Sequence, residues 1–571
     1  MLVLPMAMGM ASCGNGVTYQ GKIVDVLQQR IFDGEITVED GIITSVKECT
    51  LPEGTDYPYI MPGFIDSHVH IESSMILPHE YAQAAVRHGT IGCMADPHEI
   101  ANVLGMEGVL YMIEQSKRVR STNSGQVLFN ILFGAPSCVP SCSEDIETNG
   151  AKIDAMDVAE LLAMDEVGFL SEMMDYMGVL NKDQEVMAKI EAAHAAGKPV
   201  DGHAPELLGQ QRLDYAHAGI TTDHECSTME EGRECIEAGM KLLVREGSAA
   251  KNYQMLIPLI DEHPDEVMLC TDDYNANELL LGHINILVKR ALADGHDLWH
   301  VLKAACVNPQ QHYSVKWGLL QEGDPANFIM TSSVESDFRV LKTYLKGELV
   351  YDSESPTQSL LPIEGDNDAT LPNNFRAQPI TVDDIQTDMQ PGDTCHIIVA
   401  TDGSLLTGHD RICLTGSHDQ DTWADVQKIV VYNRYHEGAK PVVGFIRGFN
   451  LTNGAMAASV AHDCHNIVAI GSSDDDIVRA VNHVIEMKGG LVAIAGNEMA
   501  DLPLPVAGLM SPLPVEQVAQ KTDELSLLVQ KAGCNMSAPF ITMSFMCLPV
   551  IPELKITDKH LWDSESFRKI K

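Results

Sequence analysis

Short, continuous apolar runs recur through the first half of the chain, and segments with one apolar and one polar face separate them. The runs cover Pro62–His70, Thr90–Ala95, Val127–Phe133, Val167–Leu170, Pro199–Gly202, Ile220–Asp223, Lys241–Arg245 and Val267–Thr271. Such runs are typical of parallel strands that are buried on both faces. The segments between them, including Asp154–Met164, Asp183–Ala196 and Thr228–Ala238, have helical periodicity, acidic first turns and no interior proline. Eight strands that alternate with helices predict a (β/α)8 barrel in an α/β protein.

Alternating apolar and polar residues flank this centre on both sides. Gly21–Val26 and Gly34–Gly41 precede it, and Gly323–Met330 and Val340–Val350 follow it, with turn residues between the runs. Alternation with turns is typical of short antiparallel strands that have one buried face. We therefore predict one small β-sandwich domain that is built from both flanking segments.

A third region follows a segment rich in Pro, Ser, Asn and Asp, and it mixes strands with helices. Its helix over Asp474–Lys488 begins after two serines, which can cap it, and ends at two glycines. The patterns divide the chain into the small β domain (1–60 and 315–355), the barrel (61–314), a linker (356–374) and a C-terminal α+β domain (375–571).

Charge and cysteine usage narrow the classes of partner. The 571 residues include 81 Asp and Glu against 38 Lys and Arg, a formal net charge of -43. This charge repels nucleic acid and anionic membranes, so we expect a small-molecule substrate that is neutral or cationic.

The 14 cysteines include no Cys-x-x-Cys pair, which favours reduced thiols in a cytoplasmic protein. Met1–Cys13 faintly resembles a lipoprotein signal but lacks its basic residues, and no later segment has the roughly 20 apolar residues of a membrane span.

Polar side chains stand at the carboxyl ends of the predicted strands, where barrels of this kind carry their catalytic groups. A lone His-x-His pair is more often ordinary surface or core histidine than a ligand pair. Here, however, six such residues share this position: His68, His70, Glu172, His203, His224 and Asp272. Alternation along a strand places His68 and His70 on one face. Four imidazoles and two carboxylates are enough to hold two divalent metal ions about 3.5–4 Å apart.

Further polar residues lie near the same strand ends. They are Asp96, His98, Glu99, Glu225 and Asp273. Each of them either contacts the substrate or is an ordinary loop residue. Asp273 points away from Asp272 if the strand continues. Glu72 lies two residues beyond His70 and can orient a ligand imidazole. His462, Asp463 and His465 in the third region form an acid and imidazole cluster that we expect to be structural.

This set of six candidate ligands resembles that of the amidohydrolase superfamily. The sequence segments around them resemble those of its adenine deaminase branch. The segments that carry the resemblance are Pro62–Ser74, Ala95–Val103, Asp201–Pro205, Thr222–Cys226, Cys270–Asp273, His462–Asn466 and Leu502–Met510. They extend over nearly the whole chain beyond about Val17. Many members of the superfamily use a carboxylated lysine on the fourth strand, but no lysine lies between Lys152 and Lys182. Glu172 is the candidate for that bridging role, as in adenine deaminases.

The resemblance implies a site and a reaction. His68, His70 and Asp272 would bind one ion, His203 and His224 the other, and Glu172 both. The implied ions are Mn²⁺ or Fe²⁺, and the same ligands accept Zn²⁺. A metal-held hydroxide would attack C6 of adenine while Asp272 carries the proton, which gives hypoxanthine and ammonia in purine salvage. We also expect a homo-oligomer, a dimer.

Two other functions stay open at this point. A hydrolase of another cyclic amide or amidine, of a dihydroorotase-like or imidazolone-like kind, would need a lysine on the fourth strand and an arginine that clamps a carboxylate, and neither is evident. A barrel that serves only as an assembly module predicts missing ligands, whereas all six are present. Tyr274–Asn277 resembles the family least, which leaves the purine preference open.

Overall fold

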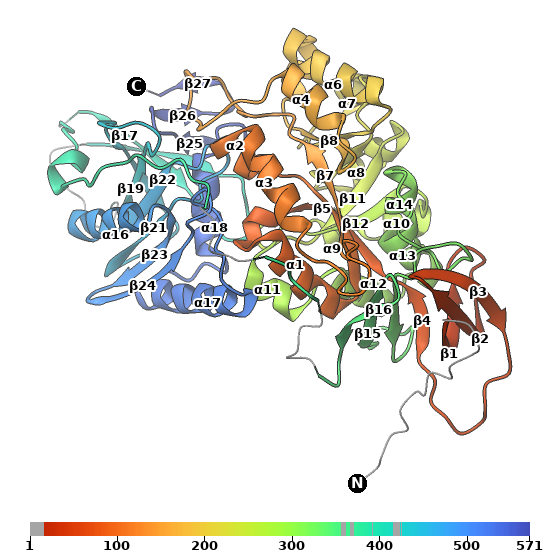
Figure 1. The fold of residues 1–571 in the computed structure, drawn as a ribbon. Helices are drawn as coiled ribbons and strands as arrows, with labels where there is room; N and C mark the ends of the chain where they lie inside the picture. The colour runs from red at the N-terminus through yellow and green to blue at the C-terminus, as the bar shows by residue number, and fades with distance from the viewer. Residues whose placement is uncertain are drawn as a thin grey trace.

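The structure is a computed structural model that describes residues 16–355, 361–365, 371–390, 392–414, 423 and 425–570. It consists of a barrel, a small sheet on one side of the barrel and a C-terminal unit on the other (Figure 1). The signal-like start at Met1–Cys13 and part of the predicted linker lie outside the described residues. The domain boundaries near residues 60, 314 and 374 stay predictions.

All eight predicted barrel strands form. They are β5 (Phe64–His70), β6 (Thr90–Ala95), β7 (Asn130–Ala135), β8 (Val167–Met173), β9 (Val200–Gly202), β10 (Thr222–Asp223), β11 (Lys241–Arg245) and β12 (Val267–Cys270). They pair in parallel from β5 to β9 and from β10 to β12, and a bridge between Val200 and Ile220 joins the two sets. The two-residue strand β13 (Asp272–Asp273) then pairs with β5 and closes the ring. The predicted (β/α)8 barrel is confirmed.

The helices predicted between the strands begin where the sequence places their caps. The three segments form α4 (Ala155–Leu162), α6 (Gln184–Ala196) and α8 (Met229–Glu237). The side chains of Asp154 and Thr228 each cap their helix in a reciprocal capping box, which satisfies backbone N–H groups that the first turn leaves free. Further helices around the barrel are α1 (Pro78–Ala85), α2 (His98–Leu104), α3 (Met106–Ser116), α7 (Gly209–His217), α11 (Ala276–Leu281) and α12 (Ile284–Ala293).

The small β unit uses both flanking segments, as expected, but its strands form one hydrogen-bonded sheet of seven and not the two separate sheets of the predicted sandwich. Its strands, in sheet order, are β16 (Glu348–Asp352), β15 (Val340–Leu345), β14 (Phe328–Thr331), β4 (Tyr59–Pro62), β1 (Val17–Asp25), β2 (Arg30–Glu39) and β3 (Ile42–Glu48). β4 leads into barrel strand β5 through Gly63. A Cβ atom on Gly63 would lie 2.1 Å from Cγ2 of Ile91, so only glycine allows this close approach.

The C-terminal unit is built on a sheet of eight strands. In sheet order they are β18 (Gly408–Cys413), β17 (Thr394–Val399), β20 (Val442–Arg447), β19 (Gln427–Tyr432), β22 (Ile467–Gly471), β21 (Gly454–Ala458), β23 (Gly490–Ala495) and β24 (Glu498–Pro503). The predicted helix forms as α16 (Asp474–Met487), with Ser473 as its cap, and α17 (Val515–Lys531) packs against α11 of the barrel. Among the described residues, no helix is both long and apolar enough to cross a membrane.

Candidate metal centre

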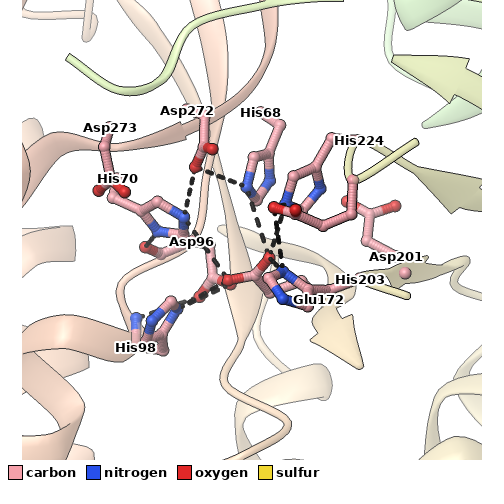
Figure 2. A network of polar contacts seen from close by, with 12 residues as sticks. His68, His70, Asp96, His98, Glu172, Asp201, His203, His224, Asp272 and Asp273 are labelled. Atoms are coloured by element: carbon pink, nitrogen blue, oxygen red, sulfur yellow. Dashed lines mark hydrogen bonds and ion pairs between the residues drawn. The ribbon is translucent and has the colours of Figure 1, made fainter. Parts of the chain in front are cut away.

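The six candidate ligands converge on one point at the carboxyl ends of the barrel strands (Figure 2). His68 and His70 come from β5, Glu172 from β8 and Asp272 from β13, while His203 and His224 directly follow β9 and β10. The strands end at a common edge of the barrel, which brings residues up to about two hundred positions apart in the sequence into contact.

Glu172 is the centre of this cluster. Its Oε2 atom lies 3.0 Å from Nδ1 of His203, 3.0 Å from Nε2 of His224 and 3.8 Å from Nε2 of His68. Its Oε1 atom lies 3.6 Å from Nε2 of His70. A second carboxylate faces the β5 pair, because Oδ1 of Asp272 lies 3.1 Å from Nε2 of His70 and 3.6 Å from Nε2 of His68.

The donor set fits a divalent cation. All six side chains are buried, and Nε2 of His68 has no hydrogen-bond partner in the described part of the chain. Nδ1 of His70 lies 3.1 Å from the carbonyl oxygen of Asp96, to which it can donate, so its Nε2 lone pair is free to bind metal. Separations of 3.0 to 3.8 Å suit nitrogen and oxygen atoms that share an ion at about 2.0–2.2 Å. Among the groups that could hold an ion, one consists of His68, His224 and Asp272 and another of Glu172, His203 and His224, while a third joins His70 and Glu172 to Asp96 and His98.

The charges around the cluster keep both central carboxylates ionised. Burial alone would raise the pKa of Glu172, but the imidazoles of His203 and His224 hold it well below its usual range. Burial likewise opposes ionisation of Asp272, but the Arg245 guanidinium, together with the facing imidazoles of His68 and His70, holds its pKa well below normal. Ionised carboxylates are the form that binds a metal ion.

Arg245 is the functional residue that the sequence analysis missed. It stands at the end of β11, fully buried, with Nη1 2.6 Å from Oδ2 of Asp272 and in contact with the carboxylate of Glu225. Those two carboxylates raise its pKa further above the normal value. The strand-end rule, applied to the seventh strand, would have identified it, since Arg245 occupies the same position there as Glu172 does on the fourth.

Several expected neighbours also reach the cluster. Nδ1 of His98 lies 3.1 Å from Oδ2 of Asp96 and 3.6 Å from Oε1 of Glu172. Glu225 is committed to Arg245, although its Oε1 also lies 3.4 Å from Nε2 of His224. All three residues therefore lie beside the candidate ligands. Glu225 differs from Asp96 and His98 in that its carboxylate is paired with the Arg245 guanidinium.

Asp273 does not point away from Asp272, contrary to the expectation from strict alternation. Asp272 has a φ of 60°, which is left-handed backbone, so the strand does not continue regularly through it. As a result, Asp273 groups with His70 and Asp272, and it accepts a hydrogen bond from the hydroxyl of Ser73. Figure 2 shows both carboxylates beside His70.

Glu72 contacts the helix that follows the second strand. Its Oε1 accepts a hydrogen bond of 3.2 Å from the backbone N–H of Ile100, in the first turn of α2. A carboxylate at this end of a helix is favourable, because the first-turn N–H groups lack partners within the helix. Glu72 therefore anchors the helix whose first two residues are His98 and Glu99.

The cluster of the C-terminal unit meets the barrel at Glu99. Nδ1 of His462 lies 2.6 Å from Oε1 of Glu99, and Nε2 of His465 contacts Oε2 of the same side chain. Asp463 groups with His98 and Glu99. A structural role was expected for these residues, with cover of the substrate or a subunit contact as the alternative for His465, and the sequence pattern does not pair them with a residue some 360 positions away.

Comparison with solved structures gives distant matches. N-acetyl-D-glucosamine-6-phosphate deacetylase from Mycobacterium smegmatis is 16% identical, with a TM-score of 0.43 over 58% of this chain and 99% of the other. 5-methylcytosine deaminase from Klebsiella pneumoniae is 14% identical, with a TM-score of 0.44 over 59% of this chain and 97% of the other. Likeness at this level carries no information on activity.

Sequence comparison is far more specific. The amidohydrolase family model matches residues 59–350, and the model of the adenine deaminase C-terminal domain matches residues 404–568. An adenine deaminase of Salinibacter ruber is 46% identical over 96% of this chain and 97% of its own length. One from Methanosarcina mazei is 44% identical over 96% of this chain and 98% of its own length. The chain therefore belongs to the amidohydrolase family and, within it, to the adenine deaminases.

Proposed function

We propose that the protein is a hydrolase that converts free adenine and water into hypoxanthine and ammonia. The observation that carries this proposal is the convergence of four histidines on Glu172 and Asp272, in a chain that matches adenine deaminases over nearly its whole length. An assembly module without activity would have no reason to retain this buried donor set. A cyclic-amide hydrolase with an arginine clamp is not favoured either, because Arg245 is already paired with Asp272 and Glu225.

The proposal includes two divalent ions, Mn²⁺ or Fe²⁺. His68, His70 and Asp272 would hold one, His203 and His224 the other, and Glu172 both. When bound, such ions make water acidic enough to supply a nucleophile near neutral pH. The assembly as a dimer and the cytoplasmic location stay predictions.

Asp272 is placed to move the proton. Arg245 holds its Oδ2, so that Oδ1 faces His68 and His70, where the reacting water would lie. Oδ1 can accept a proton from that water and deliver it to the purine ring or to the departing amine. The oxygen of water bonds to C6, one proton of that water goes to ring nitrogen N1 and the other to the exocyclic amine, and the bond from C6 to that amine breaks so that it leaves as ammonia.

The purine would lie beside the end of the second strand. His98, which is held by Asp96, and the carboxylate of Asp273 offer a donor and an acceptor for its ring nitrogens, whereas Glu99 is engaged by His98, His462 and His465. Glu225 does not fit this group, because its carboxylate is engaged by Arg245. We therefore assign it to holding Arg245.

The direct test is ammonia release from purified protein loaded with Mn²⁺ or Fe²⁺. Adenine is expected to give ammonia, whereas adenosine and cytosine are not. Asp272→Asn keeps the shape of the side chain but cannot accept a proton, and we expect it to lower kcat by about 100- to 1,000-fold. If the wild-type protein holds two ions per chain and releases no ammonia from adenine, the proposed function is wrong.

Removal of metal is expected to abolish activity and to lower the midpoint of thermal unfolding. Chelation leaves buried carboxylates and imidazoles without their common partner, and a ligand present at about 100 times its Kd contributes about 2.7 kcal/mol to stability. Dialysis against a chelator, followed by calorimetry and by an assay after Mn²⁺ is returned, checks both effects. Activity that survives complete removal of metal would contradict the two-metal site.

A further inference from the structure

The loop between β21 and β22 of the C-terminal unit reaches the mouth of the barrel. It carries His462 and His465, which are 3% and 1% exposed, and both contact Glu99, which is 2% exposed. The ring of Phe545 stacks on His462 with centroids 4.4 Å apart and planes 8° apart. His462 is thus held by a ring of its own domain as well as by its contact with the barrel.

The contact between His462 and Glu99 is a close ion pair. The separation of 2.6 Å between His462 and Glu99 is that of a direct charge-assisted hydrogen bond, whereas the ligand atoms around Glu172 lie 3.0 to 3.8 Å apart. Nδ1 of His465 accepts from the backbone N–H of Ala461 at 3.3 Å, so it is Nε2 that faces Oε2 of Glu99.

Glu99, which is held by His462 and His465, also contacts the ring of His98. Its Oε1 lies 3.3 Å from Nε2 of His98, while Nδ1 of the same ring lies 3.1 Å from Oδ2 of Asp96. The ring is therefore held between two carboxylates, with Nδ1 3.6 Å from Oε1 of Glu172 (Figure 2). An unbroken series of polar contacts runs from His462 through Glu99 and His98 to the centre of the metal cluster.

We propose that His462 and His465 are positioning residues that hold Glu99, and through it the ring of His98, in the place where adenine binds. This inference rests on the proposed function, and it gives the C-terminal domain a part in the reaction. The barrel alone supplies the candidate metal ligands, but the orientation of His98 depends on side chains from another domain. The adenine site is then complete only when the two domains are packed together.

Matched variants test the inference, because each imidazole contacts Glu99 through a different nitrogen. His462→Ala is expected to lower kcat/KM for adenine by about 10- to 100-fold, mainly through a higher KM, with metal content unchanged. His462→Asn places an amide N–H near the position of Nδ1 and should restore most of the loss, whereas His462→Gln should not. For His465, which uses Nε2, Gln should restore and Asn should not.

His483→Ala is the control. This histidine lies in α16 of the same domain, where Nε2 pairs with Asp501 at 2.9 Å, and Figure 1 places α16 on the side of the domain away from the barrel. Its kinetic constants should match those of the wild type. If His462→Ala and His465→Ala also match the wild type, or if the Asn and Gln variants show no selective recovery, the inference is overturned.

A crystal structure of the double variant His462→Ala/His465→Ala separates this inference from the proposed function. The side chains of Glu99 and His98 are expected to leave their positions, whichever substrate the enzyme uses. If both side chains stay in place, the inference fails even if the enzyme deaminates adenine. If they move while the wild-type protein does not act on adenine, the proposed function fails and the positioning role stands.

Discussion

Glu172→Gln is expected to remove at least one of the two proposed metal ions and to lower activity by more than the roughly 100-fold that loss of an outer hydrogen-bond partner costs. The amide has nearly the shape of the carboxylate, but it lacks the charge that four imidazoles surround. Its NH₂ group would also face a ring nitrogen or a cation in place of an acceptor oxygen. Metal analysis of the purified variant, together with the ammonia assay, measures both effects.

Glu166→Gln is the matched control for this experiment. Glu166 precedes the same strand, but its carboxylate pairs with Lys117 at 2.7 Å on the partly exposed surface. An exposed pair of this kind contributes at most about 1 kcal/mol, so metal content and kcat should stay at wild-type values. If Glu172→Gln retained both ions, the bridging role of Glu172 would have to be abandoned.

Arg245→Ala is expected to produce the largest loss of stability. It leaves the carboxylates of Asp272 and Glu225 buried without their common cation, and breaking a buried ion pair in this way costs about 3–5 kcal/mol. For a unit of this size the midpoint of thermal unfolding should fall by roughly 6–20 °C. The measurement is made on metal-free protein, because bound cations would partly replace the missing charge.

Two further variants make the result specific. Arg245→Lys keeps the charge but not the planar fork that serves two carboxylates, so its midpoint should lie between those of the wild type and the alanine variant. Arg290→Ala removes a partly exposed partner of Glu246 and should shift the midpoint by little. A midpoint for Arg245→Ala equal to that of the wild type would show that the buried pairs do not stabilise the fold.

The barrel could be predicted from the sequence because its strands are buried on both faces and therefore appear as uninterrupted apolar runs. The ligands could be predicted because strand direction alone brings the carboxyl ends to one edge, which places Glu172 near His203 without any knowledge of packing. Strand limits were less exact, since β7 begins at Asn130 and not at Val127.

What could not be predicted depends on local backbone geometry and on contacts between distant segments. The left-handed conformation of Asp272, which turns Asp273 towards His70, leaves no mark in an apolar pattern. The contact between His462 and Glu99 depends on how one domain packs on another, and periodicity within either domain carries no information on that. Arg245, by contrast, could have been predicted, because it ends the seventh apolar run at the same edge of the barrel as the candidate ligands.

The pairing of Asp272 with Val69, which closes the barrel, has a consequence for how the protein folds. His68 and Asp272 are separated by about two hundred residues, so the site is assembled by one of the longest-range contacts in the barrel. Contacts of this kind form late, because the entropy of closing so long a loop must be overcome first. Metal can then bind tightly only after the first and last strands have met. Uptake of metal during refolding should therefore come after most of the helical content has formed. Its time course would measure the closure of the barrel.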